Sequence, residues 1–226
     1  MRALRGHWQL LALTGLVFVT WQTPVVTPLK ILFVFFHELS HAAAAWATGG
    51  AVLELQVSAR QGGYAVTAGG SRFWILSAGY LGSLLIGVAL LILAVRTRAD
   101  RAVLGGLGAL LLMCTALYVR DTFALLFCGG AGAAMLAAAR LLPRQGCDLI
   151  LRVIGLTSLL YVPYDIFDDT LRRSALRSDA QMLAEEVGGT TMLWGGAWLV
   201  LSLIVILWVL LRGLGARSNL GAPRRR

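Results

Sequence analysis

The chain has 226 residues, of which 58% are hydrophobic and only 14% are charged, and its formal net charge is +9. Soluble domains carry about 25% charged residues, so this composition excludes an ordinary soluble protein and predicts an integral membrane protein. Arginine supplies almost all of the positive charge, in short loops and at the C-terminus, where it suits anionic lipid headgroups rather than nucleic acid.

Seven apolar runs are long enough, or nearly so, to cross a bilayer core, which needs about 20 residues. They cover residues 8–21, 29–47, 73–95, 102–119, 122–142, 149–162 and 190–211. The first run is short and is followed by Pro24 and Pro28, so we interpret it as an uncleaved first span or signal anchor. We expect an all-α polytopic membrane protein with six or seven transmembrane helices. It would form a single domain over residues 1–226 and lie in the plasma membrane of a bacterium.

The second apolar run carries an H-E-x-x-H motif at residues 37–41. Residues four apart lie on one face of a helix, so His37 and His41 can both point at one metal ion. Imidazole suits Zn²⁺, and Glu38 is the candidate general base for the activation of water. The alternative is a structural polar cluster between packed helices. Ionisable groups are costly in an apolar segment, which favours the metal site.

A small β-hairpin is predicted directly after this metal-site helix. Leu53, Leu55 and Val57 alternate with polar residues, residues 61–63 have the composition of a turn, and residues 64–67 form a second short strand. Strand edges are not tolerated in lipid, so the hairpin must lie at the interface or in a protein-lined cavity. It is either a plain connection or a strand edge that can pair with an extended substrate.

The third apolar run has small residues spaced three to five apart over residues 77–87. Such a face lets helix backbones approach closely in membranes, so we expect it to pack against the metal-site helix. Water must reach a hydrolytic site, so a polar cavity is expected between the second, third and sixth runs. Farther along, Ser178 and Asp179 are predicted to cap a short amphipathic helix.

A catalytic zinc normally takes three protein ligands, and the sequence holds only one further histidine, His7. The third ligand is therefore His7 or a carboxylate. Asp165, Asp168 and Asp169 follow the sixth run and share one helical face. We expect Asp165 or Asp168 to complete the site and prefer Asp165. The alternative is an acidic interfacial patch paired with nearby arginines.

Taken together, these motifs resemble the site-2-protease-type intramembrane zinc metallopeptidases, and in particular the small branch called peptidase family fifty, B-like. The matching segments are residues 37–41, 49–50, 69–70, 79–82, 164–169 and 178–180. The resemblance implies that His37 and His41 bind zinc, that Glu38 is the general base, and that an aspartate of the late cluster is the third ligand.

The expected function is an intramembrane zinc-dependent endopeptidase that hydrolyses peptide bonds of membrane-associated proteins. Its partners would be the lipid bilayer and a membrane-protein or peptide substrate, with no nucleic acid. The alternative is a non-catalytic membrane scaffold or metal-binding regulator that retains the motif. A transporter is less favoured, since the sequence contains no inverted repeat and no matched pair of broken helices.

Overall fold

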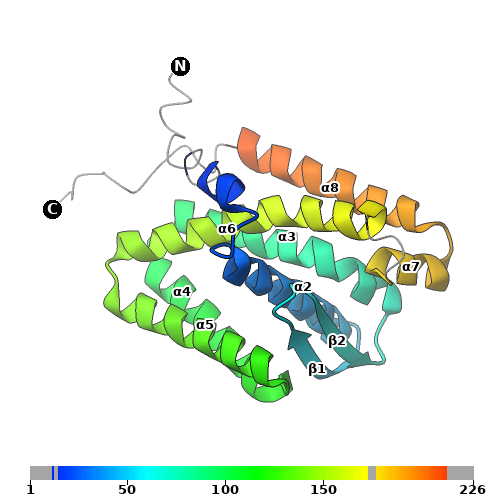
Figure 1. Cartoon of the computed structure of the whole chain (residues 1–226), viewed down its shortest axis with the longest axis horizontal. Helices are drawn as coiled ribbons and strands as arrows, with labels where there is room; N and C mark the ends of the chain where they lie inside the picture. The colour runs from blue at the N-terminus through cyan, green and yellow to red at the C-terminus, as the bar shows by residue number, and fades with distance from the viewer. Residues whose placement is uncertain (1–11, 13–14, 173–176, 213–226) are drawn as a thin grey trace.

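The computed structural model of the chain describes residues 12, 15–172 and 177–212. They form long, roughly aligned helices with one small hairpin (Figure 1). In chain order the elements are α2 (Thr27–Ala47), β1 (Ala51–Val57), β2 (Gly63–Ala68), α3 (Arg72–Arg96), α4 (Asp100–Tyr118), α5 (Thr122–Leu141), α6 (Arg144–Phe167), the π-helical turn η1 (Asp168–Arg172), α7 (Asp179–Val187) and α8 (Thr191–Leu211).

Five helices of the described part of the chain are long and apolar enough to cross a membrane: α3, α4, α5, α6 with its extension to Thr170, and α8. The predicted count of six or seven spans is therefore not confirmed. Helix α2 has the length of a span, but Lys30, Glu38 and its other polar residues lower its mean hydropathy. Residues 8–11, 13 and 14 of the predicted first span lie outside the described residues.

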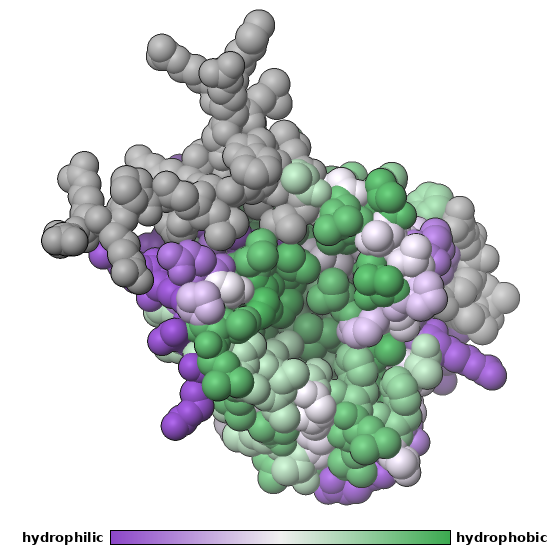
Figure 2. Space-filling view, turned by 60° about the vertical axis from the view of Figure 1, so that its left-hand side comes forward, coloured by the Kyte–Doolittle hydropathy of each residue, from purple (hydrophilic) through white to green (hydrophobic). Residues whose placement is uncertain are grey.

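The surface has the character expected for contact with lipid. Figure 2 shows hydrophobic residues over much of one face, with hydrophilic residues gathered at its margins. Large apolar side chains such as Leu85, Leu126 and Leu203 are exposed on α3, α5 and α8. Exposed apolar surface on this scale would make a soluble protein aggregate, whereas hydrocarbon solvates it.

Helix α3 lies between α2 and α6 and contacts both. Gly82 faces Ser40 of α2, and Gly87 faces Ser158 and the Gly155 carbonyl of α6, at positions where an added Cβ would clash. The Ser158 hydroxyl also donates to the Ser83 carbonyl at 2.8 Å. The small-residue face predicted for the third run is thus confirmed, and it lets three helices approach closely around the candidate site.

The predicted hairpin is confirmed. Strands β1 and β2 pair antiparallel, with a register irregularity between Val52 and Glu54. Leu55 and Val57 are buried, and the turn contains Gln61 at a φ of 62°. The hairpin follows the C-terminal end of α2, and α7 lies at the same end of the aligned helices (Figure 1). The hairpin and α7 therefore both lie near the C-terminal half of α2, which carries the H-E-x-x-H motif.

Candidate metal centre

The two motif histidines lie on one face of α2. The helix has Pro28 in its first turn and ends at Ala47, and Gly49 shortly after it takes a φ of 83° that only glycine adopts easily. One helical turn separates His37 from His41, and their ring centroids are 4.6 Å apart. Gly79 of α3 faces both rings, and a Cβ added there would lie 2.6 Å from Cε1 of His41. This glycine therefore allows α3 to cover the histidines.

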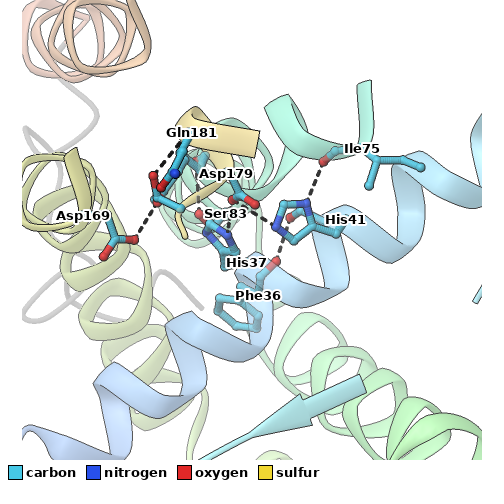
Figure 3. A network of polar contacts seen from close by, with 11 residues as sticks. Phe36, His37, His41, Ile75, Ser83, Asp169, Asp179 and Gln181 are labelled. Atoms are coloured by element: carbon cyan, nitrogen blue, oxygen red, sulfur yellow. Dashed lines mark hydrogen bonds and ion pairs between the residues drawn. The ribbon is translucent and has the colours of Figure 1, made fainter. Parts of the chain in front are cut away.

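The third group at this point is the carboxylate of Asp179. Its Oδ2 lies 2.9 Å from Nε2 of His37 and 3.2 Å from Nε2 of His41. Ligand atoms of the three residues all lie within 4.8 Å of one another. Figure 3 shows the two rings and the carboxylate turned toward one another.

The chemistry of these donors fits a zinc ion. Nδ1 of His41 donates to the Ile75 carbonyl at 2.6 Å, so a neutral ring presents a lone pair on Nε2. That lone pair faces the carboxylate oxygen of Asp179, so a proton or a cation must lie between two acceptors. Two imidazole nitrogens and one carboxylate oxygen form a ligand set that zinc takes in catalytic sites.

Asp179 is positioned by the short helix α7. Ser178 caps this helix, as predicted: its side-chain oxygen accepts a hydrogen bond from the backbone N–H of Gln181 at 3.3 Å. Ala180 and Leu183 are fully buried and fix the helix against its neighbours. Burial by itself would raise the pKa of the Asp179 carboxyl, but His41 and His37 hold it well below its usual range. The two histidines therefore favour the ionised carboxylate, which is the form in which an aspartate binds a metal ion.

The structure does not bring Asp165 or Asp168 into this group. Asp165 lines the same cavity from α6, and Asp168 begins η1. The prediction assumed that the acids next to the apolar helix would be nearest to the histidines. Instead, the chain continues past η1 and returns as α7, whose first residue reaches them. His7, the other predicted alternative, lies outside the described residues.

Glu38 is 6% exposed and lines the same cavity as the histidines and Asp179. Its carboxylate lies against the start of β2, where a Cβ added to Gly63 would be 2.8 Å from Oε1 of Glu38. The missing side chain at Gly63 thus leaves room for the carboxylate. A buried carboxylate beside the two histidines can accept a proton from a water molecule in the cavity.

The cavity itself has a volume of about 390 Å³. Its walls come from α2, the hairpin, α3, the end of α6 with η1, and α7. The expected polar cavity between the second, third and sixth apolar runs is therefore present. It also includes the hairpin and α7, which the sequence analysis had not assigned to it.

The comparison with known families agrees with this architecture. The model of the Peptidase M50B-like family matches residues 10–209. The chain belongs to this family. Together with the five apolar helices, membership identifies an integral membrane protein of a peptidase family whose peptidases are zinc metalloenzymes. No curated protein and no solved structure matches the chain.

Proposed function

We propose that this chain is a zinc-dependent endopeptidase of a bacterial plasma membrane, and that it cleaves peptide bonds of membrane-associated proteins. The observation that carries the proposal is the convergence of His37, His41 and Asp179 to within 4.8 Å, beside the Glu38 carboxylate in one cavity. Family membership supports the same reaction class.

In this proposal His37, His41 and Asp179 hold the ion. When bound, zinc supplies a Lewis acid for the scissile carbonyl and lowers the pKa of water toward about 7. Glu38 accepts the proton of the attacking water and passes it to the leaving amine. The hydrogen bond from His41 to the Ile75 carbonyl holds the ring with Nε2 toward the Asp179 carboxylate, so that Nε2 would be available as a ligand.

The hairpin suggests how a substrate could enter. Gly63, Tyr64 and Ala65 of β2 line the cavity. Among the described residues only β1 pairs with β2, so no described strand pairs with the other edge of β2. An extended peptide can form main-chain hydrogen bonds with such an edge, and a peptide bond must be extended and accessible to be hydrolysed. We therefore propose an unwound, extended segment as the form that is cleaved.

The test is the Glu38→Gln variant, purified in detergent or nanodiscs, with a fluorescent peptide library and a reconstituted membrane-protein substrate. We expect cleavage to fall by at least about 10²-fold, since general acid–base catalysis contributes about 10²–10⁴-fold. Glu54→Gln is the matched control, because it makes the same change from carboxylate to amide on β1, at a residue that does not line the cavity. Wild-type rates in Glu38→Gln would refute the proposed mechanism.

The rival function, a metal-binding scaffold without proteolysis, is less favoured. A scaffold needs the ligands but has no use for a buried carboxylate in the same cavity. Zinc content and cleavage, measured on the same samples, separate the two functions. A protein that binds zinc through His37 and His41 but cleaves nothing in the library or the membrane would support the rival.

A further inference from the structure

Tyr80 of α3 is a fully buried polar residue beside the candidate metal centre. It is 1% exposed. Its ring meets the His37 ring edge-on, with centroids 4.6 Å apart and an interplanar angle of 80°. The Tyr80 ring also contacts the Trp198 ring of α8, with centroids 5.5 Å apart. These contacts fix the tyrosine ring, so its hydroxyl has a defined place in the site.

That hydroxyl donates to Oδ2 of Asp169 at 2.6 Å. Both residues line the cavity that also contains Glu38 and the two histidines. The hydrogen bond therefore lies on the cavity wall, with the acceptor on η1 (Figure 3 labels Asp169). Rotation about the bond between the ring and its oxygen moves only the hydrogen, so the donor can be redirected without moving the ring.

Other hydroxyl donors line the cavity, but they are placed differently. Tyr64 and Thr67 belong to the hairpin and are partly or largely exposed, and Ser178 caps α7. Among the described hydroxyl side chains that line the cavity, only that of Tyr80 belongs to a ring in contact with a histidine of the centre. A donor held in a water-poor site is worth more to a developing negative charge than one at an exposed edge.

We propose that Tyr80 is a catalytic residue, and that its hydroxyl turns from Asp169 to the carbonyl oxygen of the scissile peptide bond. There it donates a hydrogen bond to the negative charge that develops on this oxygen during attack. The tyrosine keeps its proton throughout, so no proton transfer is required of it. Asp169 is the resting acceptor that satisfies the hydroxyl before substrate binds. This inference rests on the proposed peptidase function.

Two variants separate catalysis from structural support. Tyr80→Phe and Asp169→Ala both remove the hydrogen bond between these residues, but only Tyr80→Phe removes the donor. We expect kcat of Tyr80→Phe to fall about 10²-fold with KM nearly unchanged, the usual result for the loss of an oxyanion donor. For Asp169→Ala we expect a fall of less than about tenfold, the size of an ordinary hydrogen-bond loss.

A second readout does not depend on turnover. A phosphinic peptide imitates the tetrahedral geometry and charge of the attacked carbonyl, and a peptide of the same sequence with an N-methylated scissile bond imitates the ground state. Tyr80→Phe should bind the phosphinic peptide about 10²-fold more weakly than wild type and bind the ground-state peptide equally well. Zinc content and thermal unfolding, measured on each variant, show whether the centre and the fold are intact.

Two results would overturn the role of Tyr80: wild-type kcat in Tyr80→Phe, or a loss in Asp169→Ala as large as in Tyr80→Phe. The second would mean that the bond between the two residues supports the fold instead. These outcomes differ from failure of the peptidase proposal itself. In that case Glu38→Gln would keep the wild-type rate whatever the Tyr80 variants do.

Discussion

Replacing Asp179 with alanine removes the carboxylate that lies between the two motif histidines. Its Oδ2 is 2.9 Å from Nε2 of His37 and 3.2 Å from Nε2 of His41, so both imidazoles lose the same neighbour. The Asp179 side chain is 10% exposed, and no other carboxylate of the described residues lies as close to both histidines. We expect the variant to bind zinc much more weakly and to lose cleavage.

The size of the effect follows from the number of ligands. Zinc sites in small peptides bind with about 10–16 kcal/mol of free energy. Those sites have four protein ligands, so an even share is about 2.5–4 kcal/mol for each ligand, which is about 10²–10³-fold in affinity. A loss of this size is well outside the error of a competition titration with a zinc chelator.

The assay is zinc content after dialysis against buffered zinc, combined with that competition titration. Asp165→Ala and Asp168→Ala are the matched controls, because sequence alone favoured these residues as ligands. Both should keep wild-type zinc affinity. Loss of zinc from either control, with wild-type affinity in Asp179→Ala, would refute the assignment of the third ligand.

Three further predictions concern the same site. Gly79→Ala should lower zinc affinity and destabilise the protein by about 1–3 kcal/mol in thermal or denaturant unfolding, because its Cβ would push α3 away from the histidines. Gly129→Ala is the control: a Cβ at Gly129 would meet open space, so this variant should change neither zinc affinity nor stability. Gly63→Ala should lower cleavage but keep zinc, because its Cβ would meet the Gln56 carbonyl and Val34 and would displace the Glu38 carboxylate. Gly62→Ala, with only an ordinary contact at 3.6 Å, should leave cleavage near wild type. Zinc affinity should fall as pH is lowered, because imidazoles must be deprotonated to bind metal. Zinc titrations at several pH values measure this, and an affinity that does not change with pH would mean that the histidines are not ligands.

The features that the sequence predicted well depend on local patterns. Residues 37–41 place two histidines on one helical face whatever lies around them. The alternation of Leu53, Leu55 and Val57 with polar neighbours produces a hairpin strand, and the small residues of α3 pack against α2. Ser178 was also expected to cap a helix, and it does.

The third carboxylate was harder to predict because its position depends on long-range packing. Asp165 and Asp168 come shortly after the sixth apolar run, residues 149–162, which made them the acids nearest to an apolar segment along the chain. Asp179 reaches the histidines only because α7 docks through Ala180 and Leu183 after the chain has passed η1. Two signals were available. Asp179 is an acidic residue in the first turn of a short helix, although in most proteins such a residue is only part of a cap. Residues 178–180 were also among the segments that resemble the family, but the resemblance did not point to Asp179 as a ligand.

The number of spans could not be fixed for a related reason. A helix that carries a metal site within the protein must include polar residues, and these lower the hydropathy by which spans are counted. Helix α2 has 21 residues but contains Lys30, His37, Glu38 and His41. Its side chains are buried largely against α3, α6 and the hairpin, so protein rather than lipid surrounds its polar groups.

Anomalous X-ray scattering at the zinc edge, measured on crystals of the inactive Glu38→Gln protein, tests the central claim most directly. We predict a single strong zinc peak between Nε2 of His37, Nε2 of His41 and the carboxylate of Asp179. A zinc-loaded crystal with no peak at this point, or with the ion beside Asp165 and Asp168 instead, would contradict the account.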